Sequence, residues 1–295
     1  MRRRSAWSRF KINYTGAIVS LATIVWVMGL VPRVTAADKI SVVVSVLPEK
    51  FFVERVGGSH VEVSVMVGPG QSPATYEPTP RQMAALTAAR VYFRIGVPFE
   101  TLWMSRIGAT NRGMLIVNVA EGIKLRSVDV SRSPDPHVWT SPVLAKRISA
   151  RIEKTLINLD PAHKAEYERN YAKLADELDA LDAMIRARLS SLKQRAFLTF
   201  HPAWGYFADT YGLRQIAIES GGKEPGARTL LHVIEEAKRL NIKVIFVEPQ
   251  FSRSTAEMVA REIGGRVVAI DPLAENYIDN MRKVAAAFAG ASVAK

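Results

Sequence analysis

Apolar positions in the first half of the chain follow two periods in turn. Residues 40–46 read Ile-Ser-Val-Val-Val-Ser-Val, a β-branched run that is typical of a buried strand. Elsewhere the apolar spacing lengthens to three and four residues, which indicates helices. The pattern predicts strands at residues 40–46, 61–67, 91–95 and 114–117, and helices at 48–56, 80–89, 99–107 and 142–159. This alternation predicts a layered α/β lobe over residues 38–159.

A long uninterrupted helical pattern follows, over residues 160–195. Asp160 is a good N-cap and Pro161 a good first helical residue. From Tyr167 to Leu192 apolar residues recur at steps of three and four, without Gly or Pro. A helix of about thirty residues spans about 45 Å, more than one small domain needs. We predict a backbone helix that joins two lobes, with an exposed coiled-coil arm as the alternative.

Strands and helices alternate again after residue 195. The pattern predicts strands at residues 196–200, 215–218, 244–247 and 267–270, and helices at 203–211, 230–240, 256–263 and 277–288. Glycines end two of these helices, at Gly212 and at Gly264-Gly265. The predicted fold class is therefore α/β, with a second layered lobe over residues 196–295.

The first 37 residues have the layout of a secretory signal. Residues 1–11 are strongly basic, residues 16–31 carry no charge, and small residues stand at 35–37. The uncharged run of 16 residues is short for a membrane-spanning helix, which needs about 20. We predict a cleaved signal over residues 1–37 and a soluble protein exported to the periplasm or another extracytoplasmic space. An uncleaved N-terminal anchor is the alternative.

Charge and composition narrow the function classes. The chain carries a formal charge of +12, but the signal holds six basic residues and no acidic one. Removing them from the 40 basic residues leaves 34 against 28 acidic residues, mixed along the chain. No cluster of basic and aromatic residues suggests a nucleic-acid partner. The absence of cysteine excludes disulfides, thiolate nucleophiles and cysteine-type zinc sites.

Ligating side chains follow three predicted strands of the second lobe. His201, Glu248 and Asp271 each come directly after such a strand. Because ligands of open α/β sheets bind outside the carboxyl ends of strands, we expect these side chains at one edge. His137 lies in a loop of the first lobe, in the motif Asp135-Pro136-His137-Val138-Trp139.

The chain has five histidines, of which two are candidate metal ligands. His137 and His201 are flanked by Pro and Trp, in segments expected to be rigid and apolar. His60, His163 and His232 are predicted to lie on the surface. Two histidines far apart in sequence are weak evidence, so the residues alone leave a metal site as one hypothesis.

Five short motifs in order are more specific. They are Pro69-Gly70 with Tyr76-Glu77-Pro78-Thr79-Pro80, Asp135-Pro136-His137-Val138-Trp139, Phe200-His201-Pro202-Ala203-Trp204-Gly205-Tyr206-Phe207, Glu248-Pro249-Gln250-Phe251 and Ile270-Asp271-Pro272-Leu273. With these motifs around a long central helix, the chain resembles the zinc and manganese solute-binding proteins of ABC importers, the family with a ZnuA- or TroA-like fold. The resemblance runs from Ile40 to Phe288.

The resemblance implies two lobes on a rigid backbone helix, with a metal ion in the cleft between them. Carried over residue by residue, the family's ligands are His137, His201 and Asp271, with Glu248 in reserve. Nitrogen and oxygen ligands of this kind suit Zn(II) and also Mn(II). The ion is cargo, so we predict a monomeric binding protein, not an enzyme, with an ABC transporter permease as its partner.

One position departs from the family pattern. The family's usual first ligand is a His after Pro in the first loop, and here Ala74 follows Pro73. Three explanations stay open. A water fills the position, an oxygen of Gln71, Glu77 or Glu248 takes it, or the chain no longer binds metal tightly.

Two other functions stay open as well. A metallohydrolase would use the two histidines, Asp271, a bound water and Glu248 as base. Against it, the chain lacks a His-Glu-x-x-His helix, a Gly-x-Ser-x-Gly elbow and a Walker loop. An adhesin or a binder of a non-metal solute would fold normally and show no metal-dependent rise in melting temperature.

Overall fold

Four short parallel strands make the first sheet. The structure, a computed structural model, describes residues 39–127, 134–219 and 225–291. The strands are β1 (Ile40–Val44), β2 (Val61–Val65), β3 (Val91–Arg94) and β4 (Leu115–Asn118), in the order β2-β1-β3-β4. Parallel strands need crossover connections, which here are α2 (Leu47–Gly57), α3 (Pro80–Ala88) and α4 (Pro98–Thr110).

The second sheet repeats this arrangement. Its strands are β5 (Ala196–Thr199), β6 (Arg214–Ala217), β7 (Val244–Val247) and β8 (Arg266–Ala269), all parallel and in the order β6-β5-β7-β8. Its helices are α7 (Gly205–Tyr211), α8 (Ala227–Arg239), α9 (Arg253–Glu262) and α10 (Tyr277–Ala291). Two parallel sheets with helical crossovers confirm the predicted α/β class.

The segment at residues 138–189, which precedes the second sheet, is helical almost throughout. It comprises the short 3₁₀ turns η3 (Val138–Thr140) and η4 (Pro161–His163), and the helices α5 (Pro142–Leu159) and α6 (Lys164–Leu189). α6 has 26 residues, which corresponds to about 39 Å. It begins later than predicted because Asp160 does not cap it: the Asp160 carboxylate instead accepts hydrogen bonds from His163 and Tyr167.

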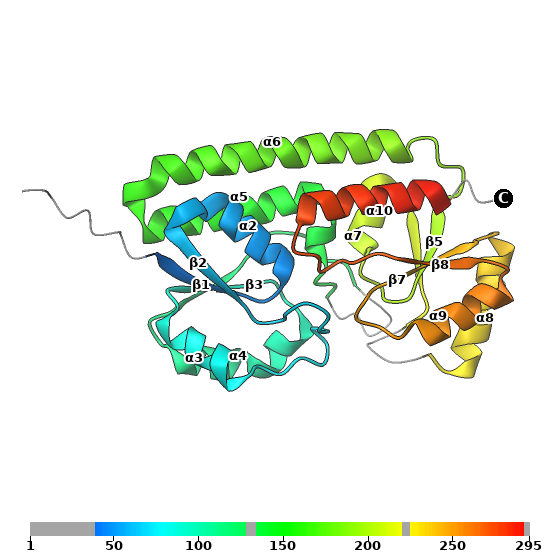
Figure 1. Ribbon diagram of the computed structural model, residues 1–295, viewed down its shortest axis with the longest axis horizontal. Helices are drawn as coiled ribbons and strands as arrows, with labels where there is room; N and C mark the ends of the chain where they lie inside the picture. Colours follow the sequence, from blue (N-terminus) through cyan, green and yellow to red (C-terminus); the bar gives the residue numbers. More distant parts are fainter. Residues whose placement is uncertain (1–38, 128–133, 220–224, 292–295) are drawn as a thin grey trace, which may run out of the picture. The chain divides into compact units, whose positions relative to one another are not determined.

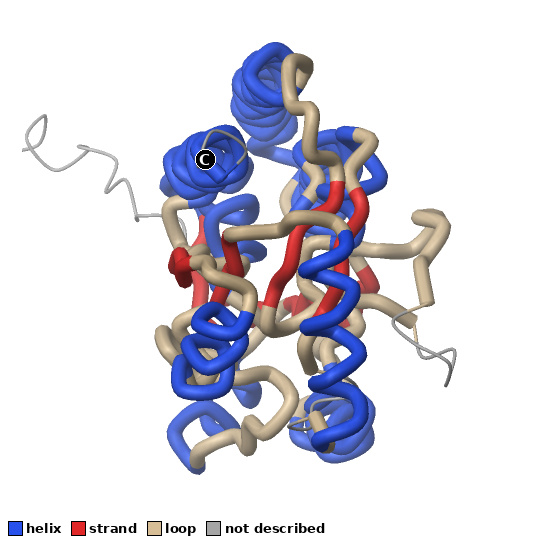
Figure 2. Tube along the Cα trace, turned by 90° about the vertical axis from the view of Figure 1, so that its right-hand side faces the viewer, coloured by secondary structure: helices blue, strands red, loops and turns tan. Residues whose placement is uncertain are grey.

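The long helix α6 packs against α2, α5 and α10 and runs above the last two (Figure 1). Its buried face includes Leu174, Leu178, Ile185 and Leu189, at the predicted helical spacing. An exposed coiled-coil arm is therefore wrong. Figure 2 shows the strands between helices above and helices below, as in a layered α/β fold.

One apolar core connects elements of both sheets. It runs from β1 and α2 through α5 and α6 to α7 and α10, and includes Phe197 and Phe246 of the second sheet. A separate cluster packs α8 and α9 on that sheet. Contacts near the candidate site add to this connection: the Tyr277 hydroxyl donates to the Trp139 carbonyl over 2.8 Å. The loops that carry His137 and Asp271 are thus held by the same buried framework.

The predicted signal over residues 1–37 lies outside the described residues. Within the ranges that are described, no helix combines the length and the apolar character needed to cross a membrane.

Candidate metal centre

The carboxyl ends of the second sheet gather polar side chains, as predicted. Because β5, β7 and β8 are parallel neighbours, the chain leaves all three at one edge. His201 follows β5, Glu248 follows β7 and Asp271 follows β8. His137 comes from the other lobe, directly before η3.

The structure brings the imidazoles of His137 and His201 together. Their Nε2 atoms lie 3.3 Å apart, and the two ring planes meet at 77°. Two ligand atoms of a tetrahedral zinc ion, each 2.0–2.1 Å from the metal, stand about 3.4 Å apart. The two side chains are 13% and 19% exposed, so the pair is largely shielded from solvent and still accessible to an ion. The spacing therefore suits two ligands of one ion.

A carboxylate holds the far nitrogen of each ring. Asp135 Oδ1 accepts a hydrogen bond from His137 Nδ1 over 2.8 Å, and Glu219 Oε2 accepts a short one from His201 Nδ1. Both carboxylates are buried. An ionised carboxylate can only accept, so each Nδ1 carries the proton and the Nε2 lone pairs of the neutral rings face each other. Facing lone pairs repel unless a cation, a proton or a metal ion, lies between them.

Aromatic side chains fix both imidazoles from the side. Phe251 stacks on His201 with ring centroids 4.8 Å apart, and Trp139 lies 5.3 Å from the His137 ring. Trp139 also donates its indole N–H to the Pro272 carbonyl over 2.7 Å. This bond joins the His137 loop to the segment that follows Asp271.

Asp271 is held by its own neighbourhood. Its Oδ1 accepts from Gln250 Nε2 over 3.0 Å and from the Leu273 amide over 2.9 Å. Among the described residues, His137, His201 and Asp271 do not form a group whose ligand atoms all lie within 4.8 Å of one another. The structure thus pairs the histidines and keeps Asp271 at a greater distance.

Glu248 is a fully buried residue that supports the strand ends. Its oxygens accept from the Thr199 hydroxyl over 2.8 Å and from the His201 amide over 3.2 Å. Burial raises the pKa of Glu248 to about 7. Because both oxygens already serve protein donors, Glu248 positions the His201 backbone, and nothing in its contacts supports the reserve ligand role.

The loop around Ala74 is exposed, and two of its side chains form hydrogen bonds to backbone amides of the same loop. Gln71 Oε1 accepts from the Gly68 amide over 2.9 Å, and Ser72 Oγ accepts from the Ala74 amide over 3.3 Å. The bond from the Gly68 amide therefore occupies the side-chain oxygen of Gln71, which is one of the three residues considered as a replacement for the absent histidine ligand.

The sequence does not indicate a role for two buried carboxylates of the site. Asp135 stands in the motif Asp135-Pro136-His137-Val138-Trp139, and nothing in the motif itself marks it as a partner of His137. Glu219 directly follows the predicted strand at residues 215–218, so the strand-end rule that selects His201 would also have selected it.

Comparisons with known proteins identify the family of the chain. Residues 42–291 match the family described as ZnuA, zinc-uptake complex component A, periplasmic. The high-affinity zinc uptake system protein ZnuA of Bacillus subtilis is 30% identical over 252 residues, covering 80% of this chain and 79% of that protein. A crystal structure of a ZnuA deletion mutant with zinc bound is 41% identical, with a TM-score of 0.84, covering 88% of this chain and 100% of that one.

A third likeness concerns the laminin-binding protein of Streptococcus agalactiae, described as bifunctional, with adhesin and metal-transporting activity. It is 25% identical with a TM-score of 0.79, covering 86% of this chain and 99% of that one. The family match confirms that the chain is a solute-binding protein and not an enzyme. With the match spanning nearly all of the described residues, the chain belongs to the ZnuA family of periplasmic zinc-uptake components.

Proposed function

We propose that the chain is an exported binding protein that captures a divalent transition-metal ion, zinc first and manganese second, and delivers it to the permease of an ABC importer. The observation that supports this most directly is the 3.3 Å approach of the His137 and His201 Nε2 atoms. With both Nδ1 atoms bound to carboxylates, this pair presents two lone pairs to one cation.

Asp271 is the proposed third ligand. Gln250 and Leu273 fix its Oδ1, so Oδ2 is the oxygen offered to an ion. Because Asp271 lies outside the histidine pair, ion binding brings this carboxylate and the two imidazoles closer together. With Ala74 in place of a fourth side-chain ligand, water completes the shell, and a site with two nitrogens and one oxygen suits both zinc and manganese.

Zinc is the first choice because of the relatives. The Bacillus subtilis protein is named for zinc uptake, and the structure at 41% identity has zinc bound. The family's place in zinc-uptake complexes supports a permease as partner and a location outside the cytoplasm. We expect a monomer.

The first test is metal content. The protein and its His137→Ala, His201→Ala and Asp271→Asn variants are dialysed against limiting zinc and analysed for bound metal. Each histidine variant loses the tightest-bound equivalent, and Asp271→Asn binds it more weakly. His232→Ala, at an exposed position of α8, is the matched control and binds as the unaltered protein does. Full tight binding in both histidine variants would show that the site is assigned wrongly.

The second test is delivery. A strain that lacks its own copy of this protein is supplied with the unaltered chain or with His201→Ala, and uptake of radioactive zinc is measured. Uptake restored by the unaltered chain alone supports delivery to a permease, while equal uptake with both contradicts it. The laminin-binding relative suggests adhesion as a second candidate, which predicts binding to immobilised laminin that His201→Ala leaves unchanged.

A further inference from the structure

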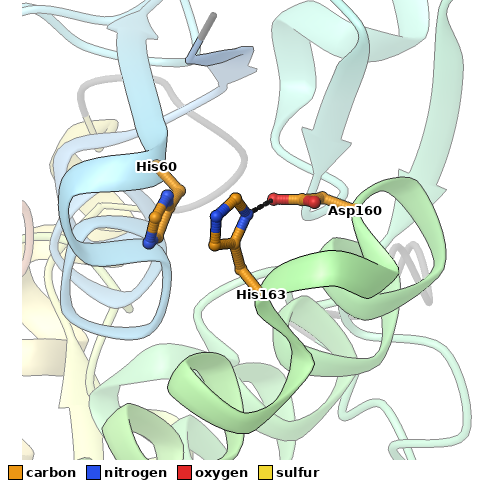
Figure 3. Close-up of side chains that lie close together, drawn as sticks. All are labelled: His60, Asp160 and His163. Carbon is orange, nitrogen blue, oxygen red and sulfur yellow. Dashed lines mark hydrogen bonds and ion pairs between the residues drawn. The ribbon is translucent and has the colours of Figure 1, made fainter. Parts of the chain in front are cut away.

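Three side chains outside the His137–His201 pair lie close enough to share an ion. His60 ends η2 (Gly58–His60), Asp160 precedes η4 and His163 ends η4 (Figure 3). One ligand atom of each lies within 4.8 Å of the others, the only such group of His, Asp and Glu in the described part of the chain. The sequence predicts both histidines on the surface, whereas both are partly buried in the structure.

Stacking brings the two imidazoles together. The rings of His60 and His163 lie almost parallel, with centroids 3.8 Å apart and planes inclined by 23°. Tyr167 packs at right angles to His60, with centroids 5.8 Å apart, and forms a wall on one side. The side chains of His60, Asp160 and His163 are 19%, 21% and 32% exposed, so an ion can enter from solvent.

Carboxylates hold both rings. Asp160 Oδ2 accepts from His163 Nδ1 over 2.6 Å and from the Tyr167 hydroxyl over 2.8 Å, and Glu166 Oε2 accepts from His60 Nε2 over 2.9 Å. Since an ionised carboxylate only accepts, Glu166 keeps the proton of the neutral His60 ring on Nε2 and leaves its lone pair on Nδ1. This is the arrangement in which a carboxylate orients an imidazole for a metal ion.

Two imidazoles and two carboxylates in one place supply the nitrogen and oxygen atoms that a divalent transition-metal ion binds. Because an imidazole binds a metal ion in the plane of its ring, the two rings turn out of their face-to-face stack when one ion binds both. A metal that binds His163 at Nδ1 takes the place of the proton now held between this nitrogen and Asp160, and the proton leaves to solvent.

We propose that His60, Asp160 and His163 form a second site for a divalent transition-metal ion, with two nitrogens and one oxygen as ligands and water completing the shell. Ligand atoms of tetrahedral zinc stand about 3.4 Å apart, so binding brings these atoms together from at most 4.8 Å and unstacks the two partly exposed rings. This site uses no residue of the His137–His201 pair and does not depend on the function proposed above.

The second site joins parts of the chain that are distant in sequence. His60 lies between α2 and β2, while Asp160 and His163 lie in the turn between α5 and α6. A hydrogen bond already links these two segments: Asn170 of α6 donates to the Val56 carbonyl of α2 over 3.1 Å. A metal ion there adds a removable cross-link between η2, directly after α2, and the turn that precedes α6.

The test is a zinc titration of the purified protein in metal-free buffer, with bound zinc measured by elemental analysis after dialysis. The unaltered protein binds two equivalents. His60→Gln and His163→Gln each lose one equivalent and keep the other, whereas His232→Gln, on the exposed face of α8, loses none. Glutamine retains hydrogen-bonding capacity at these partly exposed positions, and circular dichroism in metal-free buffer checks that each variant folds.

A second measurement separates the two sites. A His137→Ala/His201→Ala protein keeps one zinc equivalent and a zinc-dependent rise in melting temperature, and adding His163→Gln removes both. Zinc content and melting shift that are unchanged by His60→Gln and His163→Gln would overturn the second site. If the His137→Ala/His201→Ala protein instead binds two equivalents, the function proposed above fails while the second site stands.

Discussion

Glu219 offers a sharp test of how the candidate centre works, because it contacts the imidazole of His201 and not the proposed ion. The residue is 4% exposed, and its carboxylate accepts a short hydrogen bond from His201 Nδ1. That contact fixes the orientation of the ring and increases the electron density on Nε2. Removing it should weaken zinc binding without removing a ligand.

The size of the effect follows from what each substitution leaves behind. Glu219→Gln keeps an oxygen that accepts the Nδ1 proton and loses only the charge, so we expect about tenfold weaker zinc binding. Glu219→Ala also frees the ring to rotate, and we expect about a hundredfold loss, or about 2.7 kcal/mol.

The assay is competition for zinc against a chromophoric chelator of known affinity, at constant pH. Glu248→Gln is the matched control: Glu248 is also buried and bonded to His201, but through the backbone amide, and a glutamine oxygen still accepts from that amide. We expect its zinc affinity to stay close to that of the unaltered protein. Glu219→Ala binding as tightly as the unaltered protein would refute the role assigned to Glu219, and so would an equal loss in Glu248→Gln.

Three further predictions concern stability. Trp139→Phe removes the indole N–H that donates to the buried Pro272 carbonyl and should lower the free energy of unfolding in urea by about 1–3 kcal/mol; an unchanged midpoint would contradict this. Burial raises the pKa of Glu49 well above its ordinary value of 4.5, so the folded state keeps this proton to higher pH than the unfolded state, and stability falls as pH rises above that value. Glu49→Gln should therefore reduce the loss of stability between about pH 5 and pH 8, and an unchanged loss would argue against the assignment. Gly265→Ala places a methyl group in a steric clash with the Lys243 carbonyl oxygen and should lower the free energy of unfolding by about 1–3 kcal/mol, which an unaltered melting temperature would disprove.

Local patterns predicted the elements of the fold well and their ends less well. The strand expected at residues 40–46 ends at Val44, and the helix expected from Asp160 begins at Lys164. In the second case a good capping residue is used elsewhere, because its carboxylate serves His163 and Tyr167. Capping preference is a local property, and a tertiary contact overrides it.

The candidate centre was predictable in part. His201 follows a strand and His137 stands in a motif, so both could be selected from the sequence. Their 3.3 Å approach could not, because it depends on how two lobes pack across a shared core. The same strand-end rule selects Asp271, but its side chain lies farther from the two histidines. It is held there by hydrogen bonds from Gln250 and Leu273, which the sequence does not predict.

By itself, the sequence determined the α/β class, the long helix and the candidate ligands, since these depend on periodicity and on residues next to strand ends. Tertiary structure alone decided which side chains share an ion. It placed the Glu219 carboxylate against His201 Nδ1, and it stacked His60 on His163 where the end of α2 lies close to the start of α6. Spacing along the chain holds no information on such contacts, because they are set by the packing of buried surfaces between segments that are distant in sequence.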